Sequence, residues 1–203
     1  MTDWIRVRNN FVNVLFSLTA AVFAVLIISI FVYQINLNLM FDQFNVGFSK
    51  SSLGHEYLNL ISYLINPFSG SLRLTYFAAS PSGLQHFADV KLLVLLDISL
   101  LMVSFALKLI YRIKLQFYKN DAMIISSIPI IIGLIVSMDF NDFFVIFHQI
   151  LFNNNNWLFN PVTDPIINVL PDFFFEQLII MFLIVFEILI FIGYLNKKEL
   201  NHD

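Results

Sequence analysis

Long runs of apolar residues without a single charge are the feature that most restricts how this chain can fold. Residues 11–33 give 23 consecutive uncharged positions, and a helix needs about 20 mostly apolar residues to cross a bilayer. A second charge-free run occupies 122–138, and two apolar runs with two charged residues each occupy 92–111 and 173–195. With 59% hydrophobic and 12% charged residues, a 203-residue soluble domain would lack the polar side chains to cover its surface. The sequence predicts an all-α integral membrane protein with four transmembrane helices in one domain, residues 1–203.

The basic residues are unevenly distributed between the segments that join these runs, and this predicts the orientation. If both termini are cytoplasmic, eight of the eleven basic residues share one side: Arg6, Arg8, Lys108, Arg112, Lys114, Lys119, Lys197 and Lys198. The other three are scattered over the segment 34–91. Cytoplasmic loops carry an excess of Lys and Arg. We therefore expect an N-in, C-in protein whose segments 34–91 and 139–172 lie outside the cytoplasm.

Both outer segments contain apolar residues at helical spacing. The first set is Tyr57, Leu60, Ile61, Leu64 and Ile65; the second is Phe140, Phe143, Phe144, Phe147 and Leu151. Asn66 and Pro67 end the first pattern, and the asparagines at 153–156 end the second. We expect structured outer loops with short helices at the membrane surface, and the phenylalanines are predicted to face lipid or to pack.

The composition excludes several kinds of chemistry. The absence of cysteine removes disulfides, thiolate zinc sites, iron–sulfur clusters and Cys nucleophiles. A net charge of −3 without a basic cluster gives no reason to expect a nucleic-acid partner. His55, His86 and His148, with Asp89 or Asp164, would suffice for zinc, but no tight ligand spacing is present. Residues 80–83 lack the G-x-S-x-G nucleophile pattern. No metal and no cofactor are expected.

His86 and His148 are the main candidates for chemistry, one from each outer segment. Histidine exchanges protons near neutral pH, so two converging imidazoles suit general acid–base catalysis. The alternative is a pair of interfacial histidines bonded to backbone. Asp89 follows His86 by three residues on a helix expected to begin near Leu84. Its carboxylate would either orient the imidazole or cap the helix.

Three acidic residues within the predicted spans have no assigned function. Asp97 and Glu176 lie where they would line a pocket opening outward, or they are protonated and bonded to a neighbouring helix. Glu187 lies deeper in the last span. The sequence indicates no role for it.

Two stretches of the sequence resemble one family. Residues 77–91 read FAASPSGLQHFADVK and run into the second span; FHQILFN at 147–153 is followed by WLFNP, by DPIINVLP at 164–171 and by Phe174. With the four-span layout, these are similar to the lipoprotein intramolecular transacylases (Lit) of Gram-positive bacteria. The resemblance implies catalysis by His86 and His148, with Asp89, Asn153 and Asp164 in supporting roles.

The resemblance also implies the reaction. The substrate is a diacylated bacterial lipoprotein, and the sn-2 acyl chain moves from glycerol oxygen to the α-amine of its N-terminal Cys. That amine has a pKa near 8 and needs a base, while the departing oxygen needs an acid. Amide formation from an ester is downhill, so neither ATP nor metal is required. The expected location is the bacterial plasma membrane, with the active site on its extracytoplasmic face.

Two other functions are compatible with the same residues: a non-catalytic four-span accessory protein, and a membrane hydrolase of acyl esters. The sequence leaves open which lipoproteins are processed, the preferred acyl length, the oligomeric state and which histidine is the base.

Overall fold

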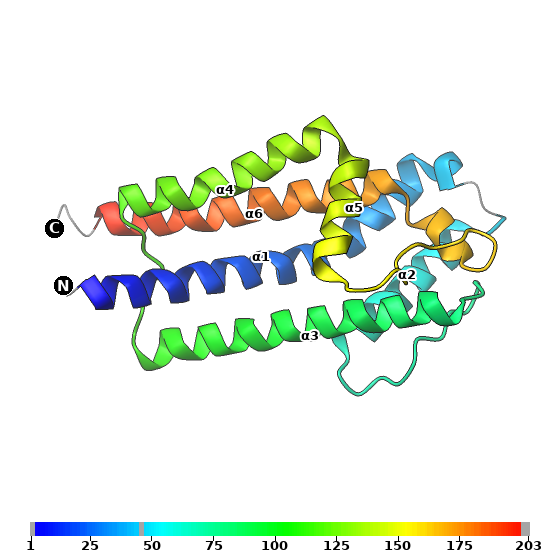
Figure 1. Cartoon of the computed structure of the whole chain (residues 1–203), viewed down its shortest axis with the longest axis horizontal. Helices are drawn as coiled ribbons and strands as arrows, with labels where there is room; N and C mark the ends of the chain where they lie inside the picture. The colour runs from blue at the N-terminus through cyan, green and yellow to red at the C-terminus, as the bar shows by residue number, and fades with distance from the viewer. Residues whose placement is uncertain (1–2, 45–46, 200–203) are drawn as a thin grey trace. The chain divides into compact units, whose positions relative to one another are not determined.

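The computed structural model describes residues 3–44 and 47–199, a region built of helices and turns without a β-strand (Figure 1). Among these residues, the helices long and apolar enough to cross a membrane are α1 (Asp3–Leu39), α3 (Pro81–Ile110), α4 (Lys119–Met138) and α6 (Asp172–Glu199). They contain the four predicted spans. The all-α, four-span prediction is therefore confirmed, whereas the N-in, C-in orientation stays a prediction.

The long helices extend well beyond the charge-free runs. α1 has 37 residues and α3 has 30. At 1.5 Å per residue these are lengths of about 55 and 45 Å, against about 30 Å for the bilayer core. α3 begins at Pro81, three residues before the start expected near Leu84 and well before the apolar run that begins at 92. His86 is a helical residue, as that expectation requires.

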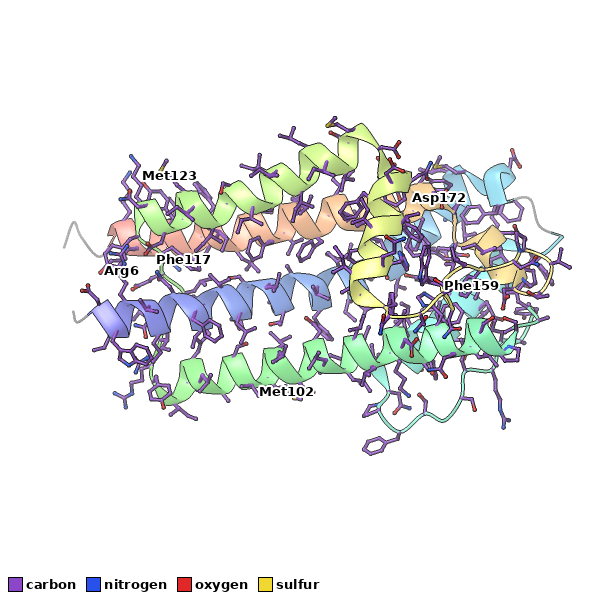
Figure 2. All side chains as sticks on the ribbon, viewed as in Figure 1. Arg6, Met102, Phe117, Met123, Phe159 and Asp172 are labelled. Carbon is purple, nitrogen blue, oxygen red and sulfur yellow. The ribbon has the colours of Figure 1, made fainter. Side chains whose placement is uncertain are left out.

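The apolar side chains of these helices are largely uncovered within the chain. In the most apolar continuous stretch of 18 residues in α3, only 6% of the residues are buried. Met102, labelled in Figure 2, is 61% exposed, and Leu92 is 69% exposed. Water would penalise this much exposed apolar surface, whereas lipid tails cover it. Exposure and helix length together define a multi-pass membrane protein.

The chain divides into two compact units, of which the first contains both ends of the chain. This terminal unit comprises Met1–Val25, Asp97–Met138 and Ile179–Asp203. Its buried cluster consists of Ala21, Phe117, Ala122, Phe186 and Ile190. The prediction of a single membrane domain stays a prediction.

A close helix contact organises the terminal unit around the segment between α3 and α4. The Phe117 backbone N–H donates to the Gly193 carbonyl at 3.0 Å. A Cβ on Gly193 would lie 2.6 Å from the Phe117 ring, so α6 needs glycine at this position. The segment therefore packs directly on the α6 backbone.

The second unit, here called the histidine unit, comprises Leu26–Leu96 and Asp139–Leu178. Its shorter helices are η1 (Phe41–Phe44), α2 (Lys50–Ile65), α5 (Phe140–Leu151) and η2 (Pro165–Val169). α2 and α5 lie where the apolar spacing predicts short helices. Their location at a membrane surface stays a prediction.

Aromatic side chains form the core of the histidine unit. The rings of Tyr33 and Tyr57 stack with centroids 4.2 Å apart, and Phe174 packs edge-on against both. The hydroxyl of Tyr33 donates to the Val169 carbonyl at 2.9 Å, and that of Tyr57 donates to Ser29 Oγ at 2.6 Å. Burial raises the pKa of Tyr57 to about 12, so its hydroxyl keeps the proton it donates.

Two buried charged side chains hold the loop that leads from α2 to α3. The Glu56 carboxylate accepts the backbone N–H groups of Thr75 and Tyr76 at 2.9–3.1 Å. Lys91 Nζ donates to the carbonyl and hydroxyl oxygens of Ser69 at 2.8 and 2.6 Å. Because these groups are buried, the bonds are sheltered from water, and they fix the approach to α3.

Candidate active site

Asp164 fixes the beginning of α3, the helix that carries His86. Its carboxylate accepts the Ser80 backbone N–H at 2.7 Å, the Ser80 hydroxyl at 2.9 Å and the Thr163 hydroxyl at 2.8 Å. Ser80 Oγ in turn accepts the Gly83 N–H at 3.0 Å, as a helix N-cap does. The loop that follows α5 is thereby joined to the first turn of α3.

The charge on Asp164 and the missing side chain of Gly83 make this junction possible. Burial disfavours the carboxylate, but the hydrogen bonds from Ser80 and Thr163 outweigh it and lower its pKa. A Cβ on Gly83 would overlap the Asp164 carboxylate and lie 3.4 Å from the Phe159 ring. Glycine at this position leaves room for the Asp164 carboxylate to reach Ser80.

His148 lies on α5 with its tautomer set by the helix itself. Its Nδ1 is 2.8 Å from the Phe144 carbonyl oxygen, one turn earlier. A carbonyl only accepts, so Nδ1 carries the proton, and in the neutral ring Nε2 has a free lone pair. Burial lowers the pKa of His148 below its usual value. The imidazole is therefore neutral at pH 7, with Nε2 able to take up a proton.

His86 and His148, both predicted as catalytic, lie next to each other in the histidine unit. Their ring centroids are 5.8 Å apart and the ring planes are inclined by 41°. His86 is 7% exposed, and its Nδ1 is buried without a hydrogen-bond partner among the described residues. A buried polar atom left unpaired costs about 1–3 kcal/mol. An incoming ligand that bonded to this nitrogen would recover that free energy.

Aromatic rings surround the two imidazoles. Between ring centroids, Phe144 is 4.0 Å and Trp157 is 5.0 Å from His148. The Phe152 ring contacts both imidazoles, with centroid distances of 4.9 Å to His86 and 5.6 Å to His148. Phe159, labelled in Figure 2, lies 5.5 Å from His86. Such surroundings favour neutral imidazoles, strengthen electrostatic interactions and suit an acyl chain.

Asp89 forms its hydrogen bonds with groups other than the imidazole three residues before it. Its carboxylate accepts the Gln85 amide at 2.8 Å and the Asn154 amide at 3.0 Å. The bond from Asn154 connects α3 to the turn after α5. Asp164 makes a second connection between the start of α3 and the same loop. Asn153, the predicted supporting residue, is exposed in that turn.

Several residues of this site are absent from the sequence-based prediction. Ser80, Gln85 and Asn154 fix the geometry through hydrogen bonds over long separations that no spacing reveals. Phe144 is predicted only to face lipid or pack. Its place four residues before His148 on a helix is the one signal in the sequence that it contacts the imidazole.

The alternative of a metal site receives no geometric support. Within residues 3–44 and 47–199, no three His, Asp or Glu side chains come together as metal ligands. His55, which would be needed for such a group, is exposed on α2. The absence of a metal requirement stays a prediction.

Fold and site together define a class: a multi-pass, all-helical membrane protein with two apposed histidines in an aromatic setting. A family model described as lipoprotein intramolecular transacylase Lit matches residues 9–175. The chain therefore belongs to the Lit family, a family of membrane acyltransferases. No curated protein matches the sequence significantly.

Solved structures of the Lit protein of Bacillus cereus share this fold. One is 23% identical with a TM-score of 0.73, covering 94% of this chain and 91% of that one. Two others have one histidine replaced by alanine or by arginine. They are 24% identical, cover 98% of this chain and 94% of theirs, and have TM-scores of 0.72 and 0.66 respectively.

Proposed function

We propose that this protein moves the sn-2 acyl chain of a diacylglyceryl-Cys lipoprotein onto the α-amine of the same Cys, giving an N-acyl lyso-lipoprotein. The observation that carries the proposal is the apposition of His86 and His148, 5.8 Å apart in an aromatic setting. Family membership supports the type of reaction. The reaction takes place on the extracytoplasmic face of the plasma membrane, where diacylated lipoproteins are exposed.

His148 is the base in this proposal. Its Nε2 takes a proton from the α-amine as the nitrogen attacks the ester carbonyl, and the imidazolium then returns the proton to the departing glyceryl oxygen. The bond between Nδ1 and the Phe144 carbonyl keeps the reactive nitrogen pointing away from α5. One C–O bond breaks, one C–N bond forms, and the proton moves from nitrogen to oxygen.

His86 stabilises the oxyanion of the tetrahedral intermediate. A proton on its unpartnered Nδ1 would donate to the negative oxygen, and the apolar surroundings increase the strength of that bond. Asp164 and Asp89 are positioning residues, because they hold α3 and the loop after α5 together. Asn153, which is exposed in the turn after α5, is a supporting residue in this proposal. Since amine and ester belong to one molecule, the site needs only to fold the substrate.

Product mass tests this proposal. The purified full chain in detergent is incubated with a synthetic diacylated lipopeptide, and products are read by tandem mass spectrometry. An intramolecular transfer leaves the mass unchanged and places the acyl group on the N-terminal residue fragment. His148→Ala should abolish the product, while His55→Ala, at an exposed histidine outside the site, should not.

Each alternative function predicts a different result. A hydrolase lowers the mass by one acyl chain and releases a fatty acid. A transferase using phospholipid raises the mass by one chain and requires added lipid. A non-catalytic protein leaves the lipopeptide unaltered, and any of these three results overturns the proposal.

A further inference from the structure

The terminal unit contains a polar cavity that the proposed reaction does not use. Its volume is about 210 Å³, whereas a cavity needs only about 10–15 Å³ to hold one water molecule. Its polar lining consists of three cations, two amides and a phenol: Arg112, Lys114, Lys197, Asn9, Gln116 and Tyr118. No Asp or Glu of the described residues lines it. The cavity is therefore positively charged.

The three cations have no carboxylate partner in the described part of the chain. The ion pair at this end of the unit joins Arg6 to Asp121 at 2.6 Å, and Asn10 donates to the same carboxylate. Figure 2 labels Arg6 and Phe117 in this region. Because Arg6 and Asn10 already engage Asp121, the charge of the cavity is not neutralised by it. Among the described residues, the cations of the cavity are thus left for water or for an anion from solution to solvate.

The segment that carries two of the cations is held rigidly. The buried Asn13 amide donates to the carbonyls of Lys114 and Gln116, both at 3.1 Å. The Asn196 amide donates to the Leu115 carbonyl at 3.1 Å. These bonds attach the segment to α1 on one side and to α6 on the other. Its basic side chains therefore project from a backbone that is fixed before any ligand arrives.

Arg112 occupies a backbone conformation that disfavours it. Its φ is +52°, and it is the one non-glycine residue of the described chain with positive φ. The bond from Ile113 N–H to the Lys108 carbonyl closes the end of α3 around it, a position at which glycine is preferred. A residue kept at a strained position in place of glycine indicates that its side chain is used.

We propose that this cavity binds a phosphate group. Arginine binds phosphate through two parallel N–H bonds, lysines add charge and the amides add donors. Basic pockets between transmembrane helices bind anionic lipid headgroups in this way. A volume of about 210 Å³ is sufficient for a phosphate group with a few waters, and the charged and polar lining does not favour an acyl chain. The phosphate belongs either to a membrane lipid or to a soluble anion.

Thermal unfolding of the full chain in neutral detergent tests the site. A ligand that binds only the folded state raises the unfolding midpoint saturably. The probes are dioleoylphosphatidylglycerol, with phosphate-free dioleoylglycerol as its control, and sodium phosphate, with sodium chloride at equal ionic strength. A lipid site gives saturation with phosphatidylglycerol far below the phosphate concentration required. A soluble-anion site gives saturation with sodium phosphate and no additional effect of the lipid.

Two variants separate the site from general surface charge. Arg112→Gly removes the guanidinium and relieves the positive φ, so its midpoint without anion should equal or exceed that of the wild type. Its half-saturating concentration should rise at least about fivefold, and Lys114→Gln should behave similarly. Lys119→Gln, an exposed lysine just outside the cavity, is the control and should bind as the wild type does. Absence of saturation with both phosphate probes, or an equal loss in the control, overturns the proposal.

Discussion

The two units of this protein differ in how far the titratable side chains of their candidate sites are buried. In the histidine unit, Glu56, Asp164 and His86 are at most 7% exposed, and aromatic rings surround His86. In the terminal unit, Arg112 and Lys114 are exposed and line the same cavity as Lys197. An apolar environment favours neutral imidazoles, whereas an anion site needs uncompensated charge. Changes in the histidine unit should therefore affect the reaction, and changes in the terminal unit should affect ligand-dependent stability.

The largest effect is expected at the two histidines. His86→Ala and His148→Ala should each lower acyl transfer at least about 100-fold, because a positioned acid or base contributes that much. Both variants should retain the helical circular dichroism of the wild type. Product formation from the diacylated lipopeptide measures the loss, with His55→Ala as the unaffected control. Activity retained in either variant would disprove the paired-histidine mechanism.

The second-largest effect is expected on kcat/KM when the assay is acidified. Protonation of the α-amine, with a pKa near 8, lowers kcat/KM tenfold per pH unit. Protonation of His148 should add a second tenfold per unit, beginning below its ordinary pKa of 6.5, because burial lowers the pKa of this imidazole. Log kcat/KM measured from about pH 5 to about pH 9 should steepen only below pH 6.5. A steeper limb that begins above that value contradicts the assignment.

Gly83 offers a smaller, geometric test of the histidine unit. A Cβ introduced by Gly83→Ala would overlap the Asp164 carboxylate, so either this side chain turns away from Ser80 or the loop and the start of α3 separate. Displacements of this kind misplace reacting groups, and kcat should fall about tenfold. Gly70→Ala is the matched control, because a Cβ there meets nothing within 4 Å. Equal kcat in the two variants would show that Asp164 does not position His86.

The smallest effect is expected in the terminal unit. Arg6→Gln breaks the Arg6–Asp121 ion pair. Because the Arg6 side chain is 41% exposed, this pair contributes little to the free energy of unfolding. Acyl transfer per molecule should stay within about twofold of wild type. The lipopeptide assay at equal protein concentration measures it. A tenfold loss would mean that the terminal unit takes part in the reaction and that the contrast between the units fails.

The sequence predicts the helices well because the physical cause is local. A charge-free run of about 20 residues has few alternatives to a membrane helix, and the apolar spacing around Tyr57 and Phe144 defines α2 and α5. The start of α3 is harder, since the residues from Pro81 to Lys91 are too polar to be recognised as part of a span. Hydropathy identifies what faces lipid and not where a helix begins.

The candidate site is predictable as a set of residues and not as an arrangement. His86 and His148 attract attention because histidine is rare in such a chain, but nothing in their spacing fixes the 5.8 Å between their rings. Hydrogen bonds between distant segments produce that arrangement. The bond between Ser80 and Asp164 joins positions 84 residues apart.

That long separation has a consequence for biosynthesis. A ribosome completes α3 before it reaches Asp164, so the first turn of that helix is made while its carboxylate partner does not yet exist. The order of synthesis thus delays assembly of the candidate site until the segment that contains Asp164 has been made. Nascent or truncated chains that end before Asp164 are expected to lack the hydrogen bonds that hold the start of α3.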